Sequence, residues 1–142
     1  MAMTKKQKTT LLSNVNLFSG VGPKALDQIA NLMTEIEFAP ERYIVRQGQV
    51  GTGFYLIAAG RAKVTRGNTV IAYLGPGDFF GELSVLDQSP RMAHVVAEQP
   101  TTCLALASWD LAKLLEKNPK VTLALLRVVA GRLRAVSEQH TH

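Results

Sequence analysis

One segment of the sequence, residues 80–93, carries residue types that can bind an anion. Gly81 precedes a stretch long enough for one helical turn, and Pro90 ends that stretch. The first backbone N–H groups of such a turn, those of Leu83 and Ser84, point toward one spot. Because these groups carry partial positive charge and Gly81 has no Cβ, an anion can approach the backbone closely there.

Two charged side chains flank the predicted turn. Arg91 begins the strand that follows, and its planar, permanently charged guanidinium matches two oxygens of a phosphate. Glu82 would repel a phosphate but would accept a hydrogen bond from a neighbouring sugar hydroxyl. This combination indicates a ribose phosphate, and a cyclic phosphate with one negative charge fits a site that has one arginine and no metal. The alternative is that Glu82 and Arg91 form an ion pair at a turn, with a purely structural role.

A catalytic role for this segment has less support. Glu82 as a general acid needs a second catalytic group nearby, and the motif contains none. His94 has no His-x-His or acidic companion among residues 35–107, and a metal site of the cupin type needs such a cluster. The sequence therefore predicts no enzyme, no metal site and no cofactor.

Two blocks of sequence precede and surround the segment. In residues 8–34, Pro23 follows Gly22 at a plausible first helical position, which predicts short helices. Residues 35–107 hold most of the glycines and a series of short apolar runs between turn signals, including a hairpin turn at Gly67. These runs are residues 43–45, 54–57, 62–64, 70–74, 93–96 and 103–106. Many short strands at regular spacing predict a sandwich or barrel.

We expect two helices in residues 108–138. Ser108 can cap the first helix, and Asn118, which precedes Pro119, can cap the second. The second helix is apolar on two opposite faces. One face holds Val121, Ala124, Leu125, Val128, Val129 and Ala135, and the other holds Leu123, Leu126, Ala130, Leu133 and Ser137. One face can lie on the strand block, and the other predicts a symmetric homodimer. The alternative is that the chain's own N-terminal helices cover both faces.

Composition limits the class of protein. The 142 residues correspond to one domain, and 46% hydrophobic with 19% charged residues excludes a disordered chain. Sixteen Lys and Arg against eleven Asp and Glu give a net charge of +5, which suits an acidic ligand but decides little alone. The single cysteine, Cys103, excludes an internal disulfide and is expected to be a buried small hydrophobe. Without a signal-peptide core or an apolar run of membrane-spanning length, we expect a cytoplasmic protein with no membrane partner.

The segment from Phe80 to Ala93 resembles the phosphate-binding cassette of the cyclic nucleotide-binding domain. The residues around it agree with that family: Arg46-Gln47-Gly48 before a turn, the run 54–57 followed by Gly60, and the run 76–82. The likeness spans roughly residues 18–138. It is strongest to the sensory half of catabolite-activator-type regulators and to prokaryotic channel cyclic-nucleotide domains.

The resemblance implies a mainly β fold. It implies an eight-stranded double-stranded β-helix, a jelly-roll-like β-roll, with N-terminal helices and two C-terminal helices in one domain over residues 1–142. The implied ligand-binding residues are Gly81, Glu82, Leu83, Ser84, Arg91, Met92, Ala93 and Ser137. In this family pattern Glu82 holds the ribose 2′-hydroxyl and Arg91 the cyclic phosphate. The last helix closes over the base, where Ser137 can reach adenine.

Met92 departs from the family pattern, which usually has a small or hydroxyl residue after the arginine. A hydroxyl there favours guanine in many members, so its absence favours cyclic AMP over cyclic GMP, while the bulk of Met92 could also narrow the pocket. We therefore expect a sensor domain that binds cyclic AMP and forms a homodimer through its last helix. The alternatives are the sensory part of a transcription regulator whose DNA-binding region is absent from this chain, and a nucleotide-independent dimer module. We do not expect this chain alone to contact DNA.

Other side chains receive structural interpretations. Trp109 is expected to pack at the start of a helix. Arg127, Arg132 and Arg134 lie on a helix that is otherwise apolar, so we expect them to be solvated or ion-paired.

Overall fold

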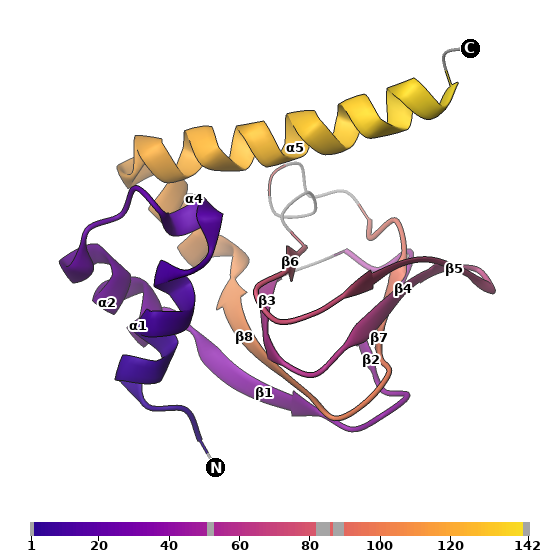
Figure 1. The fold of residues 1–142 in the computed structure, drawn as a ribbon, viewed down its shortest axis with the longest axis horizontal. Helices are drawn as coiled ribbons and strands as arrows, with labels where there is room; N and C mark the ends of the chain where they lie inside the picture. The colour runs from indigo at the N-terminus through magenta and orange to yellow at the C-terminus, as the bar shows by residue number, and fades with distance from the viewer. Residues whose placement is uncertain (1, 51–52, 82–85, 87–89, 141–142) are drawn as a thin grey trace.

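A computed structural model describes residues 2–50, 53–81, 86 and 90–140, with residues 136–140 described by their backbone alone. The N-terminal helices lie at one end of the molecule and the strands at the other, and the last helix crosses above both (Figure 1). This arrangement confirms the predicted order of helices, strands and helices along the chain.

The N-terminal block holds α1 (Lys5–Ser13), the short 3₁₀ helix η1 (Asn16–Phe18) and α2 (Pro23–Leu32). Helix α1 begins with a capping box, in which Thr4 accepts from the Gln7 amide and Gln7 accepts from the Thr4 amide. Helix α2 begins at the predicted proline.

The described residues form eight strands in two antiparallel sheets of four. The strands are β1 (Thr34–Phe38), β2 (Tyr43–Val45), β3 (Gly53–Ala59), β4 (Ala62–Arg66), β5 (Thr69–Leu74), β6 (Phe79–Phe80), β7 (His94–Ala97) and β8 (Thr101–Ala107). One sheet has the order β1-β8-β3-β6 and the other β2-β7-β4-β5. The β-roll is therefore confirmed, and each predicted apolar run lies in a strand or overlaps one. Strands β1 and β6 were not among those runs.

The core is divided into two separate clusters of buried residues. The larger one joins the helices to the first sheet and includes Leu12, Phe18, Ile29, Phe54, Leu56, Leu104, Leu106, Leu111 and Val121. The smaller one lies within the roll and includes Ile44, Ile57, Ala62, Phe80, Val95 and Cys103. Cys103 is fully buried, as predicted, and burial raises the pKa of its thiol to about 12.

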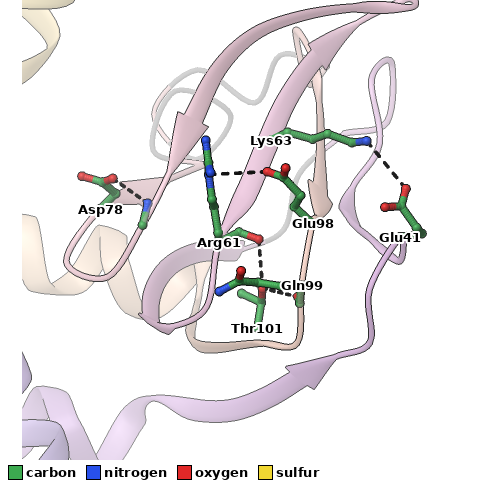
Figure 2. A network of polar contacts seen from close by, with 8 residues as sticks. Glu41, Arg61, Lys63, Asp78, Glu98, Gln99 and Thr101 are labelled. Carbon is green, nitrogen blue, oxygen red and sulfur yellow. Dashed lines mark hydrogen bonds and ion pairs between the residues drawn. The ribbon is translucent and has the colours of Figure 1, made fainter.

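Polar contacts fix the turns at one end of the roll (Figure 2). The hydroxyl of Thr101 shares its one proton between the carbonyl oxygens of Arg61 at 3.1 Å and Gln99 at 2.8 Å. The Arg61 side chain pairs with Glu98 at 3.5 Å. Gly60 lies beside this network with φ of +98°, and Thr101 is only 2% exposed. A Cβ at residue 60 would overlap the backbone around Thr101, so this turn requires glycine.

The chain ends in α4 (Ser108–Lys117) and α5 (Pro119–His140). The prediction that Ser108 caps α4 is wrong: Ala107 is the N-cap, and no side chain caps the helix there. Asn118 lies between the two helices and makes a hydrogen bond with each of them. Its side-chain amide donates to the Leu114 carbonyl at 2.9 Å, and its own carbonyl accepts from the Thr122 amide at 3.1 Å. Among the described residues, no helix has the length and apolar character needed to cross a membrane.

Trp109 does not pack at the start of α4 as expected, because it is 63% exposed. Leu111, two residues further along the helix, is fully buried. Positions two apart lie on different faces of a helix, so the core contact of Leu111 turns Trp109 toward solvent.

Candidate functional site

The backbone of Arg91 is held by the segment between β2 and β3. The Arg91 amide donates to the Gln49 carbonyl at 2.7 Å, and the Arg91 carbonyl accepts from the Gly48 amide at 2.8 Å. Val50 and Pro90 form an isolated antiparallel bridge next to this pair. Arg91 is thus anchored by short strand-like pairing just before β7 begins.

The Arg91 side chain points inward. It is 8% exposed, and its Nη2 donates to the Gly53 carbonyl oxygen at 2.8 Å. Burial lowers the pKa of the guanidinium from its ordinary value, and the electrostatic interaction with Tyr55 opposes that shift. An arginine stays charged under such a shift, so the site places a cation in the interior.

Gly81 lies against this cation. Its φ is +96°, a conformation that residues with a Cβ rarely adopt. A Cβ at residue 81 would lie 2.6 Å from Arg91 Nη1 and 2.7 Å from the Gly53 carbonyl oxygen. The structure therefore brings together two of the predicted site residues, and a glycine is what allows that approach.

Three predicted site residues, Glu82, Leu83 and Ser84, lie outside the described residues. So does most of the predicted helical turn, although Leu86 is helical and 50% exposed. The predicted contacts of these residues with a ligand, and the alternative Glu82–Arg91 ion pair, stay predictions.

Met92 and Ala93 follow Arg91 along the chain. The Met92 side chain is 62% exposed, so it does not fill the described interior beside Arg91. The Met92 carbonyl accepts from Arg66 Nε at 3.4 Å, which joins this segment to the β4–β5 hairpin. Ala93 is half-buried and directly precedes β7.

Helix α5 reaches the strand that leads into Gly81. The Arg132 guanidinium donates to the Phe79 carbonyl at 3.5 Å and lies 5.4 Å from the centroid of the Phe79 ring. Burial lowers the pKa of Arg132 from its ordinary value, and the nearby Asp78 carboxylate raises it. Ser137 lies in the helical backbone of α5, but its side chain is outside the described residues.

The two apolar faces of α5 have different surroundings. On the predicted inner face, Val121 and Leu125 are buried and three more residues are half-buried: Ala124, Val128 and Val129. Ala135, assigned to that face, is exposed. On the other face Leu123, Leu126 and Leu133 are 48%, 58% and 65% exposed. The N-terminal helices therefore do not cover both faces of α5.

The described part of the chain holds no group of three His, Cys, Asp or Glu side chains placed to bind a metal ion. His94 instead accepts a hydrogen bond at Nδ1 from the Gln47 amide at 3.0 Å. Its ring also meets Tyr43 edge-on, with ring centroids 5.1 Å apart.

Comparison with protein families matches residues 35–118 to the cyclic nucleotide-binding domain. This match extends from β1 to the end of α4 and includes Gly81 and Arg91. The chain belongs to the cyclic nucleotide-binding domain family. The cyclic nucleotide-binding domain is itself a non-catalytic regulatory module.

Individual relatives agree with this cyclic nucleotide-binding domain assignment. The chain is 34% identical to the Cyclic AMP receptor protein of Thermus thermophilus over 83% of its own length and 57% of the relative's. It is also 34% identical to a cGMP-dependent protein kinase of Toxoplasma gondii, over 67% of this chain and 10% of the kinase. The crystal structure of Thermus thermophilus Catabolite Activator Protein superimposes with a TM-score of 0.80 at 32% identity, over 87% of this chain and 61% of that one. The chain thus spans little more than half of the bacterial relative it matches.

Sequence reasoning missed two contacts around the site of this cyclic nucleotide-binding domain, those of Gly53 and Arg132. The Gly53 carbonyl that binds Arg91 is a main-chain group, so no side-chain pattern indicates it. Arg132 was expected to be solvated or ion-paired, and its contact with the Phe79 carbonyl of β6 was not anticipated. Its spacing offered a signal, because residues 121, 125, 128 and 132 recur on one helical face.

Proposed function

We propose that this chain binds a cyclic nucleotide and that Arg91 pairs with the cyclic phosphate. One observation carries the proposal: a guanidinium that is 8% exposed has, among the described residues, one hydrogen-bond acceptor, the Gly53 carbonyl. A buried cation requires compensation by an anion or by several acceptors. A ligand phosphate with one negative charge would supply it, and the absence of a Cβ at Gly81 lets the backbone there lie close to Nη1.

The remaining contacts follow the family pattern. Glu82 would accept from the ribose 2′-hydroxyl, and the amides of Leu83 and Ser84 would donate to the phosphate. Helix α5 would close over the base, with Ser137 close to adenine. The contact of Arg132 with Phe79 supports this part of the proposal, since it already holds α5 against the strand that leads into Gly81.

Cyclic AMP is the proposed ligand, with cyclic GMP as the alternative. Met92 offers no hydroxyl for guanine, and its exposed side chain leaves the interior beside Arg91 unfilled. The named ligand specificities of the relatives differ, one being a cyclic AMP receptor and the other a cGMP-dependent kinase. Comparing Met92→Ser with the unmodified chain in a cyclic nucleotide screen tests this choice, because tighter cyclic GMP binding by the variant would place residue 92 against the base.

The outer face of α5 supports a homodimer. Leu123, Leu126 and Leu133 are exposed at a spacing of three and seven residues, which places them along one stripe. A second copy of the helix would remove these leucines from water by a symmetric contact. A dimer without nucleotide binding is the competing function, and thermal unfolding with and without cyclic AMP separates the two, because a bound ligand must raise Tm.

We further propose that residues 1–142 form one sensor domain in the cytoplasm. Similarity to the sensory part of a catabolite-activator-type regulator suggests a role in transcription for a longer protein. For this chain alone we expect salt-sensitive, non-specific contact with DNA at most, measured by gel shift.

The deciding experiment is calorimetric titration of the purified chain with cyclic AMP and cyclic GMP. Arg91→Ala should weaken binding by roughly 2–5 kcal/mol, the usual cost of removing one partner of a buried charge pair. Arg42→Ala is the matched control, because it removes the same charge from an exposed position. If Arg91→Ala binds as tightly as Arg42→Ala, the phosphate is not held by Arg91 and the proposal fails.

A further inference from the structure

We propose that Gln47 and His94 are positioning residues for Arg91, and that neutral His94 is needed for full nucleotide affinity. The inference deepens the proposed function and rests on it. Neither residue is expected to touch the ligand, and both act through the backbone that holds Arg91.

The segment from residue 46 to residue 50 is the frame on which Arg91 rests. Gly48 and Gln49 exchange backbone hydrogen bonds with Arg91 at 2.8 and 2.7 Å. The same segment continues toward Gly53, whose carbonyl binds the guanidinium. A displacement of this segment would therefore shift both the backbone and the side chain of Arg91.

Gln47 ties this frame to two other elements of the roll. Its backbone amide donates to His94 Nδ1 at 3.0 Å, and its side-chain oxygen accepts from the Gly67 amide at 3.2 Å. Gly67 lies in the β4–β5 turn, next to Arg66, whose Nε donates to the Met92 carbonyl at 3.4 Å. Gln47 thus joins the frame to the hairpin that also holds the residue after Arg91.

His94 can make its contact in one charge state only. Its Nδ1 accepts from the Gln47 amide, and an imidazole that has gained a second proton has no acceptor nitrogen left. Protonation of the ring would therefore remove the acceptor from this contact. Loss of this acceptor would leave the exposed Gln47 amide to water and release one end of the frame.

Among the described residues, the groups that face His94 come from β2 and β4 and include no carboxylate. Tyr43 from β2 meets its ring edge-on, and Arg46 lies over the Tyr43 ring at 4.2 Å. On the other side, β4 contributes Thr65, which pairs with His94, followed by Arg66. These neighbours are neutral or cationic, so a protonated His94 would add a third positive charge beside two arginines.

The test is a pH series of cyclic AMP titrations from pH 8 to 5.5, with a melting curve at each pH to establish that the chain is folded. The unmodified chain should lose affinity about two- to tenfold toward low pH, the usual value of one hydrogen bond. His94→Phe keeps a ring against Tyr43 but has no acceptor. It should bind with the weaker affinity at every pH and lose the pH dependence.

Two further variants separate positioning from a general effect. Gln47→Ala removes the link to Gly67 but leaves its own amide to donate to His94, so affinity should fall about two- to tenfold while the pH dependence remains. Gln28→Ala changes an exposed glutamine on α2 and should bind as the unmodified chain does. His140 and His142 are present in every variant and contribute equally to each profile.

The outcomes distinguish this inference from the function on which it rests. If the unmodified chain binds neither cyclic AMP nor cyclic GMP at any pH, the proposed function fails and takes this inference with it. If the unmodified chain binds but its affinity is flat from pH 8 to 5.5, His94 has no such role and only the inference is overturned. The same holds if a folded His94→Phe keeps the original pH dependence. If His94→Phe does not fold, the inference is still tested by the pH dependence of cyclic AMP affinity in the unmodified chain and by the affinity of Gln47→Ala.

Discussion

Replacing Gly81 by alanine should displace the Arg91 guanidinium and weaken nucleotide binding. A Cβ at residue 81 would lie 2.6 Å from Arg91 Nη1, whereas ordinary contact begins at 3.4 Å. Backbone lies on the other side at 2.7 Å, so the guanidinium is the group that must move, by about 0.8 Å. A shift of this size stretches a 2.8 Å hydrogen bond past the usual limit. The displaced guanidinium would also lose its contact with the ligand phosphate, and a hydrogen bond to a charged group is worth about 1.5–3 kcal/mol, or about 10- to 100-fold in affinity.

The matched control for this change is Gly77→Ala. Gly77 has φ of +91°, close to the +96° of Gly81, but nothing lies within 4 Å of a Cβ built there. Both variants should lose about 1–3 kcal/mol of folding stability to backbone strain, measured by urea unfolding. Only Gly81→Ala should lose affinity in calorimetric titration with cyclic AMP. Equal affinities for the two folded variants would refute the idea that the Gly81–Arg91 approach positions the cation.

Three further results are expected. Leu126→Glu places a charge on the outer face of α5, so sedimentation should detect monomers if α5 forms the dimer, and an unchanged dimer would remove α5 from the interface. Gly60→Ala should destabilise the roll more than Gly77→Ala does, because its Cβ would overlap the backbone around Thr101, and chemical unfolding measures the difference. Burial raises the pKa of the Cys103 thiol to about 12, so the folded chain keeps that proton at alkaline pH while the unfolded chain loses it. The free energy of unfolding should therefore fall as the pH rises from the ordinary thiol pKa of 9.0 toward about 12. Cys103→Ala should show a smaller fall over the same interval.

Local sequence patterns predicted most of the roll, for identifiable reasons. Strands β3, β4, β5 and β8 are short apolar runs bounded by glycine or by polar turns, and such runs are typical of β-strands. Strand β6 has two residues, too few for any periodicity. Strand β1 alternates polar and apolar residues directly after α2, and its pairing with β8 is a contact between distant parts of the chain. Nothing within a short window indicates such a partner.

The candidate site also has some features that the sequence could predict and others that it could not. The inward position of Arg91 and its closeness to Gly81 could be anticipated, since both belong to one contiguous motif. The Gly53 carbonyl could not, because any residue carries that group and its role depends on where β3 begins. The cap at the start of α4 was assigned to Ser108 from its residue type, but the chain turns one residue earlier. Residue type limits what a position can do, and tertiary contacts decide which of those options is used.

The hydrogen bond from Arg91 to Gly53 joins residues 38 positions apart. Contacts between such distant residues close a long loop, and the entropy that this costs is offset only when the sheet that brings the two residues together also forms. Neither half of the roll made alone would carry a binding-competent arginine. Ligand affinity therefore reports that the whole roll is folded. An isolated peptide spanning residues 80–93 should not compete with the intact chain for ligand.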